Sequence, residues 1–245
     1  MSVTIRIIVC AAALIATASL GPALAQSEAT TSCNASEADG VSLDLQISGC
    51  TTLIEAGAGS ASNLAIAFSN RGAAHSGKGQ HDRAIEDYDQ AIKLDPNDAD
   101  AFNNRGNAHN NEREYDLAIR DFDQALKLKP DFAFAFNNRG IVYDNLGQTS
   151  RALEDYDRAI ALDPDYGDAL NNRGIADLNL GRLEAALADF NNALRIDPKK
   201  ASSLFGRGVA KRRMGDTAGG DADIAAAKAL SADVTDGMAA AGVRP

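Results

Sequence analysis

The chain has 245 residues, and its 24 Lys and Arg stand against 34 Asp and Glu, so its formal net charge is −10 at pH 7. This acidic balance argues against a nucleic-acid partner, because binding to the phosphate backbone requires a basic surface. Trp is absent and aromatic residues make up only 5% of the sequence. We therefore expect a core built largely from Ala, Leu and Ile, a composition that suits closely packed helices.

Residues 1–25 are typical of a cleaved signal peptide. One basic residue, Arg6, precedes an apolar run over 7–20, and Pro22 and the sequence Ala-Leu-Ala at 23–25 supply a helix break and a cleavage site before Gln26. The apolar run is shorter than the ~20 residues that span a bilayer, although retention as an anchor stays an alternative. We expect an exported protein, periplasmic or secreted, that does not insert in a membrane after cleavage.

Removal of this segment leaves two cysteines, Cys33 and Cys50. An even pair in an oxidising compartment predicts a disulfide, which here closes a loop of about 17 residues and contributes roughly 3 kcal/mol to stability. The alternative is two separate thiols. No C-x-x-C is present, so we interpret the bridge as structural and not as a redox centre.

Several residue types recur at an interval of 34 residues from residue 65 onward. A glycine, an alanine and a proline keep this interval, at Gly72, Gly106, Gly140, Gly174 and Gly208, at Ala91, Ala125, Ala159, Ala193 and Ala227, and at Pro96, Pro130, Pro164 and Pro198. A fixed period over several residue types predicts a stacked array of identical supersecondary units.

Each unit contains two segments with helical periodicity. In the first unit, Phe68, Gly72 and His75 share one helical face, and the residues Ala84, Tyr88, Ala91 and Leu94 share a second. The first helix is expected to end near 77–79 and the second at Asp95-Pro96, because proline cannot continue a helix. Asn97 is expected to cap the next first helix.

These units resemble the tetratricopeptide repeat. An apolar residue stands four positions before the glycine, and an alanine, an aromatic residue, a second alanine and the proline follow it, as in the unit "AFNNRGNAHNNEREYDLAIRDFDQALKLKP". Clean copies cover 65–98, 99–132, 133–166 and 167–200. The resemblance implies an all-α, right-handed superhelix of stacked helix–turn–helix units, in which the first helices line the concave surface.

The two ends of the array depart from the repeat. In 201–234, Gly220, Ile224 and Ala232 replace the expected alanine, aromatic residue and proline, so we expect a degenerate fifth copy followed by a C-terminal cap over 235–245, with a short helix near 233–241. At the other end, 26–64 is expected to be an N-terminal cap with an isolated second helix. Its segment 26–40 is expected to be loose, with the disulfide in place of a first helix.

Two opposite charges recur with the same period. Arginine precedes every repeat glycine, and an aspartate recurs on every second helix, at Arg71, Arg105, Arg139, Arg173 and Arg207, and at Asp87, Asp121, Asp155, Asp189 and Asp223. We predict a ladder of partly buried ion pairs that sets the register between units, favoured by the fork geometry of arginine. An anion site lined by the arginines is the alternative.

Asparagine also recurs on the first helices, at Asn70, Asn104, Asn138 and Asn172, with Asn103, Asn137 and Asn171 beside them. In the implied superhelix these side chains point into the concave groove. An amide offers a donor and an acceptor and so matches the backbone of an extended peptide, and a similar asparagine ladder holds peptides in the O-GlcNAc transferase family. The alternative is an exposed polar face without a ligand.

We therefore expect a non-enzymatic scaffold whose groove binds an extended segment of another exported or envelope protein. A structural adaptor or self-assembling subunit that uses its outer helices is the second hypothesis. No acid/base pair with supporting residues, P-loop or nucleophile motif is present. We accordingly expect no catalytic residues, cofactor or metal site, and the oligomeric state stays open.

Overall fold

A computed structural model describes residues 21–35, 37–57 and 59–244, and the expected signal segment over 1–20 lies outside them. All regular structure in these residues is helical, which confirms the all-α fold class. The helices are α1 (Gly21–Asn34), α2 (Leu43–Glu55), α3 (Ala61–Gly77), α4 (His81–Leu94), α5 (Ala99–Asn111), α6 (Tyr115–Leu128), α7 (Ala133–Asn145), α8 (Thr149–Leu162), α9 (Gly167–Asn179), α10 (Leu183–Ile196), α11 (Ala201–Arg213), α12 (Thr217–Leu230) and α13 (Val234–Ala240), and a 3₁₀ turn covers Glu37–Asp39.

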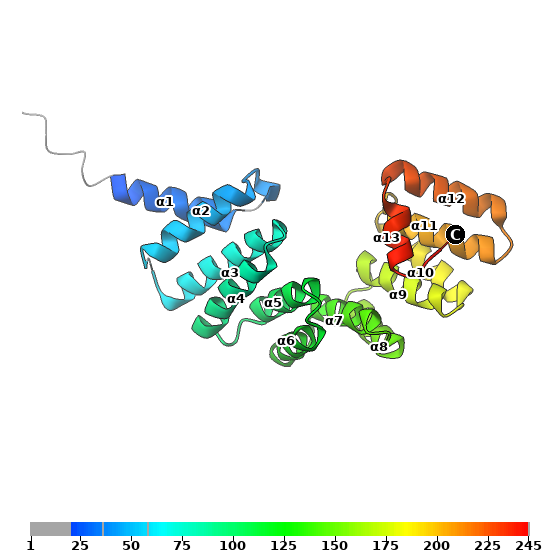
Figure 1. Cartoon of the computed structure of the whole chain (residues 1–245), viewed down its shortest axis with the longest axis horizontal. Coiled ribbons are helices and arrows are strands. Elements are labelled where there is room, and N and C mark those ends of the chain that lie inside the picture. The colour runs from blue at the N-terminus through cyan, green and yellow to red at the C-terminus, as the bar shows by residue number, and fades with distance from the viewer. Residues whose placement is uncertain (1–20, 36, 58, 245) are drawn as a thin grey trace, which may run out of the picture. The chain divides into compact units, whose positions relative to one another are not determined.

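The chain divides between Asp95 and Pro96 into two compact units. Unit 1 holds the hairpins α1–α2 and α3–α4, and unit 2 holds α5–α6, α7–α8, α9–α10, α11–α12 and the short α13, as Figure 1 shows by colour and label. Within each unit, consecutive hairpins stack on one another, which is the predicted arrangement of helical pairs.

In unit 2 the two kinds of helix form different layers. The first helices of neighbouring hairpins contact one another, α5 with α7, α7 with α9 and α9 with α11. The second helices are instead packed between first helices of their own and the next hairpin. We call the solvent-exposed side of α5, α7 and α9 the first-helix face. Among the described residues, no helix has both the length and the apolar character needed to cross a bilayer.

The repeat glycine allows the two helices of a hairpin to approach closely. A Cβ atom placed on Gly140 would lie 2.6 Å from Cε1 of Tyr156 on the second helix of the hairpin. This distance is shorter than the contacts that Cβ atoms make in proteins. Tyr156 is fully buried there, and Phe122 and Phe190 occupy the same slot in the flanking hairpins. The glycine is therefore fixed by packing against the aromatic residue sixteen positions later.

The turn within each hairpin needs a left-handed backbone. Gly79, Gly147, Gly181 and Gly215 have φ between 71° and 95° at this position. In the hairpin α5–α6 the same position holds Arg113, with φ of 62°. Among the described residues, Arg113 is the only non-glycine residue with a positive φ. This conformation costs an L-residue with a Cβ about 1–2 kcal/mol.

Two expectations for the helix ends need correction. Asp98, and not Asn97, caps α5, because its carboxylate accepts hydrogen bonds from the backbone N–H groups of Asp100 and Ala101, each at 3.0 Å. The segment 26–34, expected to be loose, belongs to α1, so the first hairpin has both of its helices. The expected cleavage bond before Gln26 lies within this helix.

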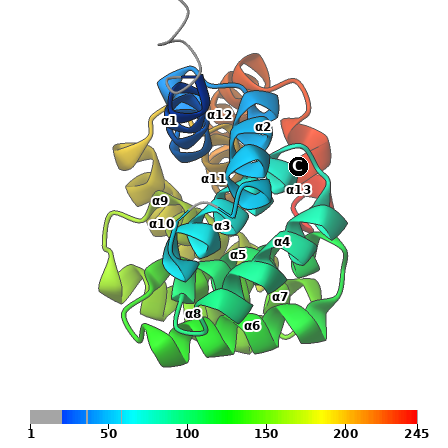
Figure 2. The same ribbon diagram turned by 90° about the vertical axis from the view of Figure 1, so that its left-hand side faces the viewer.

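The polar residues of α1 are compatible with a helix because their hydroxyl groups bond within it. Thr30, Thr31 and Ser32 each donate a hydrogen bond to the carbonyl group four residues earlier, at 2.8, 3.0 and 2.9 Å. Cys33 near its end is bonded to Cys50 on α2, with Cα atoms 4.6 Å apart, and both are fully buried beside Ala67. The predicted disulfide is thus present, but it joins α1 and α2 instead of replacing a helix. Figure 2 shows these two helices side by side.

Candidate functional site

The recurring arginine and aspartate form the same fork in each of the five hairpins from α3–α4 to α11–α12. Nε and Nη2 of the arginine donate to the two carboxylate oxygens of the aspartate sixteen residues later, at 2.6–2.9 Å. The pairs are Arg71–Asp87, Arg105–Asp121, Arg139–Asp155, Arg173–Asp189 and Arg207–Asp223. The arginine lies on the first helix and the aspartate on the second, so the fork closes one hairpin.

The expectation that these forks set the register between units is therefore wrong for the main pair. The link between hairpins comes from the third nitrogen, Nη1, which in Arg139 donates to Asp123 of the preceding hairpin at 2.5 Å and in Arg173 to Asp157 at 2.7 Å. Burial alone would lower the pKa of Arg139, but its bonds to Asp155 and Asp123 raise that pKa above its usual value. Because three nitrogens of Arg139 and Arg173 already face carboxylates, these guanidinium groups are not arranged as an anion site.

Three of the five fork arginines also stack on an aromatic ring of their own helix. The Cζ atoms of Arg71, Arg105 and Arg139 lie 5.5–5.7 Å from the ring centroids of the phenylalanines three residues earlier. In unit 1, Nη1 of Arg71 donates to Oγ1 of Thr51 on α2, at 3.0 Å. The arginines thus combine ion pairing and packing, which is a structural role.

The asparagines of unit 2 form a continuous chain of side-chain hydrogen bonds. Asn138 Nδ2 donates to Asn103 Oδ1 of the preceding hairpin at 3.0 Å, and Asn172 Nδ2 donates to Asn137 Oδ1 at 3.0 Å. Within each hairpin the buried asparagine donates to its exposed neighbour, as Asn137 does to Asn138 Oδ1 at 3.4 Å. We call this chain of amides the asparagine ladder, with members Asn103, Asn104, Asn137, Asn138, Asn171 and Asn172.

The two members of each pair differ in exposure. Asn103, Asn137 and Asn171 are buried, and a partner chain could not reach them without a rearrangement. Asn104, Asn138 and Asn172 are half-exposed on the first-helix face. The two asparagines of a pair are adjacent in sequence, so their side chains differ in direction by about 100° around the helix. One of them therefore faces the first helix of the following hairpin, and the other borders the solvent.

The ladder ends where the sequence changes. Ser202 and Ser203 of α11 donate to Asn171 Oδ1 at 3.1 and 2.8 Å, and Phe205 and Gly206 replace the asparagine pair in that helix. In unit 1, Asn70 has a different role, because its Nδ2 donates to the carbonyl group of Cys33 at 3.1 Å and to Asn34 Oδ1 at 3.2 Å. Asn70 thereby attaches α3 to the end of α1 beside the disulfide.

One end of the first-helix face carries aromatic side chains. Phe134, at the start of α7, is 56% exposed, and its ring centroid lies 4.9 Å from that of Tyr166, the residue before α9. Burial and the carboxylates of Asp168 and Asp163 raise the pKa of Tyr166 to about 12. The hydrogen bond of Tyr166 with Asn137 lowers this pKa, but by less. Tyr166 therefore connects this aromatic edge to the asparagine ladder, which repeat reasoning alone did not predict.

The opposite end of the face holds a cavity of about 380 Å³. Ile141 and Asp144 of α7, Asn172 and Ile175 of α9, and the segment Ala240–Gly242 line it. The segment after α13 is held in place by Asn179, whose Nδ2 donates to the carbonyl group of Ala241 at 2.8 Å. Arg213 adds bonds to the carbonyl groups of Leu178 and Arg244, at 3.1 and 3.3 Å.

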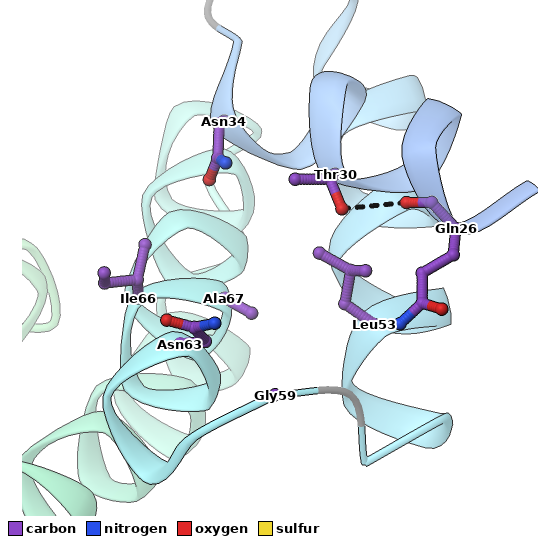
Figure 3. Close-up of a pocket in the computed structure, with 8 residues that line it drawn as sticks. All are labelled: Gln26, Thr30, Asn34, Leu53, Gly59, Asn63, Ile66 and Ala67. Carbon is purple, nitrogen blue, oxygen red and sulfur yellow. Dashed lines mark hydrogen bonds between the residues drawn. The ribbon is translucent and has the colours of Figure 1, made fainter. Parts of the chain in front are cut away.

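Unit 1 has a smaller cavity of about 250 Å³ between its first three helices. Figure 3 shows Gln26 and Thr30 of α1, Leu53 of α2 and Asn63 and Ile66 of α3 around it. The hydroxyl group of Thr30 is bonded to the carbonyl group of Gln26. None of the described residues that line this cavity has an ionisable side chain.

The histidines of the first helices lie beside the forks. His109 Nδ1 lies 2.7 Å from Glu114 Oε2, and its Nε2 lies 3.8 Å from Asp121 Oδ2, while His75 contacts Gln80 and Asp87 in the same way. Each histidine therefore bridges the turn of its hairpin to the fork. Within the described residues, no group of three His, Cys, Asp or Glu side chains is placed to hold a metal ion.

Comparisons with known proteins agree with this architecture. Profiles described as "TPR repeat" match 77–111 and 176–215, and profiles described as "Tetratricopeptide repeat" match 99–132, 133–166 and 155–188. No curated protein sequence is significantly similar to the chain.

Many solved structures are similar in fold. YrrB, described as a TPR protein with an unusual peptide-binding site, has 25% identity and a TM-score of 0.55, with 79% of this chain and 98% of YrrB covered. MamA from Desulfovibrio magneticus RS-1 has 22% identity and a TM-score of 0.59, with 71% of this chain and 97% of that structure covered. Another MamA structure has 22% identity and a TM-score of 0.57 over 66% of this chain and 95% of MamA.

The profile matches run without a gap from residue 77 to residue 215, which is more than half of the 245 residues. The helical pairs of the structure have the same period. The chain therefore belongs to the tetratricopeptide-repeat family.

Proposed function

We propose that this protein is a non-enzymatic interaction scaffold that binds an extended peptide segment of another exported protein on the first-helix face of unit 2. The observation that carries the proposal is the row of half-exposed amides at Asn104, Asn138 and Asn172. The likeness to YrrB, which is described as having a peptide-binding site, supports it.

The amides of this row keep hydrogen-bonding capacity although they bond to one another. An asparagine side chain has two N–H donors and an oxygen with two lone pairs. Asn138 uses one N–H towards Asn103 and one lone pair towards Asn137. One donor and one acceptor remain for a ligand, and they match the N–H and C=O groups of a peptide in extended conformation.

The ladder also fixes the orientation of these amides before a ligand binds. An exposed asparagine on an isolated helix would lose side-chain freedom on binding, which costs about 0.5–1.5 kcal/mol for each immobilised side chain. The bond to the preceding hairpin imposes this loss during folding instead. Interaction among the amides is therefore compatible with binding and favours it.

The test compares Asn138→Ala with Asp155→Asn. Both variants affect the hairpin α7–α8, but Asp155 belongs to the fork and does not contact the asparagine ladder. The probe is a fluorescein-labelled peptide chosen by selection of a random dodecapeptide library on the purified protein, and fluorescence anisotropy gives its dissociation constant. Equilibrium denaturation gives the free energy of unfolding of each variant, so that a change in binding can be compared with a change in stability.

We expect Asn138→Ala to weaken peptide binding by about tenfold, since two hydrogen bonds of ~0.5–1.5 kcal/mol are lost. Asp155→Asn should lower stability and leave the dissociation constant within about twofold. Equal weakening by the two variants would mean that binding follows only the stability of the hairpin. That result, or unchanged binding by Asn138→Ala, would contradict the proposal.

A further inference from the structure

Asp144 differs from the other protected aspartates of the structure in having no cationic partner. The fork aspartates each bond an arginine, and Asp177 lies 3.3 Å from Arg182. Asp144 accepts hydrogen bonds from the hydroxyl groups of Tyr156, at 3.0 Å, and Thr149. Among the described residues it forms no ion pair.

The position of Asp144 means that the lack of a cationic partner costs folding free energy. Its carboxylate is half-buried at the wall of the cavity between α7, α9 and the segment after α13. Desolvation raises the pKa of Asp144 above its usual value despite the two hydroxyl donors. A carboxylate taken partly out of water is stabilised by a cation and costs folding free energy without one.

The remaining lining is suited to a long aliphatic side chain that ends in a charge. Ile141 and Ile175 supply an apolar surface one helical turn before the level of Asp144 and Asn179. Lysine and arginine bury their methylene groups along apolar surface while the charged end reaches a polar partner. The formal net charge of −10 also favours a basic ligand over an acidic one.

We infer that this cavity is a subsite for one Lys or Arg side chain of the bound peptide, with Asp144 as its counter-ion and Ile141 and Ile175 in contact with its methylene groups. The inference rests on the proposed peptide function and specifies which peptides bind. The backbone of the peptide lies along Asn138 and Asn172, and Asn172 also lines the cavity, so the amide row and the subsite are adjacent.

A double-mutant cycle between peptide and protein tests the subsite. The random dodecapeptide library is selected on wild-type protein, and the tightest peptide is synthesised in two forms, with its basic residue retained or replaced by norleucine. Norleucine keeps the methylene groups of lysine and removes the charge. The dissociation constants of both peptides are measured by fluorescence anisotropy on wild type and on Asp144→Asn.

The matched control is Asp100→Asn. Asp100 is exposed on α5, so its substitution changes the net charge by the same amount without touching the cavity. We expect norleucine to weaken binding at least tenfold on wild type and on Asp100→Asn, but no more than about twofold on Asp144→Asn. A thermal unfolding curve of each variant confirms that it is folded.

Three other outcomes are distinguishable. Selected peptides without a basic residue would overturn the subsite and leave the proposed peptide function standing. The same holds if norleucine weakens binding equally on wild type and on Asp144→Asn. If the library yields no binding peptide at all, both the subsite and the proposed function are overturned.

Discussion

Arg139 bonds two aspartates that differ in burial, so substituting each of them compares a buried and an exposed ion pair of the same arginine. Arg139 donates two hydrogen bonds to Asp155 of its own hairpin and one to Asp123 of the preceding hairpin. The side chain of Asp155 is 6% exposed, whereas that of Asp123 is 54% exposed. We predict that Asp155→Asn destabilises unit 2 much more than Asp123→Asn does.

The magnitudes follow from burial. Removal of one partner from a buried ion pair costs about 3–5 kcal/mol, because the remaining charge loses its compensation. The Arg139 side chain is 19% exposed and keeps Asp123, so we place the cost of Asp155→Asn at about 2–3 kcal/mol. An exposed pair contributes ~0–1 kcal/mol, and Asp123→Asn should remain within that range.

Urea denaturation followed by far-UV circular dichroism measures both variants. Stacked repeats can unfold in parts, so amide hydrogen exchange in α7 and α8 should accompany it to locate the loss. Asp155→Asn should accelerate exchange in these two helices first. If the two variants lower the free energy of unfolding equally, or if Asp155→Asn costs less than about 0.5 kcal/mol, the fork does not hold the hairpin.

Four further predictions follow from single features. Reduction of the Cys33–Cys50 disulfide, which closes a loop with a sequence separation of 17, should destabilise unit 1 by about 3 kcal/mol and leave hydrogen exchange in α7–α12 unchanged. Arg113→Gly should raise the unfolding free energy by about 1 kcal/mol, because Arg113 has a φ of 62°, and an unchanged denaturation midpoint would refute this reasoning. Gly140→Ala should cost about 1–3 kcal/mol by overpacking against Tyr156, as thermal unfolding can show. Asp144→Asn should be more stable than wild type at pH 7, because burial raises the pKa of this carboxyl group in the folded state and its ionised form therefore costs stability. That gain should disappear as the pH falls below the ordinary aspartate pKa of 3.8, where the carboxyl group of Asp144 is protonated in both the folded and the unfolded state, and denaturation at several pH values would measure it.

The sequence predicted the period, the helical pairs and the identity of the charged partners because each of these repeats. Gly140 and Tyr156 illustrate this: a glycine and an aromatic residue keep a constant separation of sixteen residues in each of the four clean copies. The sequence could not show whether Arg139 pairs within or between hairpins, since the interval of 34 residues is compatible with both. Only the packing of α7 on α8 and on α6 decides between Asp155 and Asp123.

The buried and exposed members of the asparagine ladder could not be separated from the sequence either. Asn137 and Asn138 are the same residue type at adjacent positions, and the contact of α7 with α9 decides which of them is buried. The helix α1 was missed for a different reason. Its Ser and Thr residues favour turns by composition, and here their hydroxyl groups bond to the helix itself while the disulfide holds it against α2.

Residues that repeat and residues that do not repeat have different roles in this chain. Arg139, Asp155 and Gly140 recur in the five hairpins from α3–α4 to α11–α12, and their main contacts lie within their own hairpin. Asp144 and Phe134 have no counterpart of the same type: the slot of Asp144 holds Ser76, Asn110, Leu178 and Arg212 in the other copies.

Stacking alone therefore requires neither residue, and both have a physical cost. Phe134 is 56% exposed, and Asp144 is partly desolvated without a cation. Proteins commonly carry such local costs where a ligand offsets them. Both residues lie on α7 at opposite ends of the first-helix face, with the amide of Asn138 between them in sequence. The departures from the period thus mark where a ligand would bind, and they predict a peptide with an apolar or aromatic residue near Phe134 and a basic residue near Asp144.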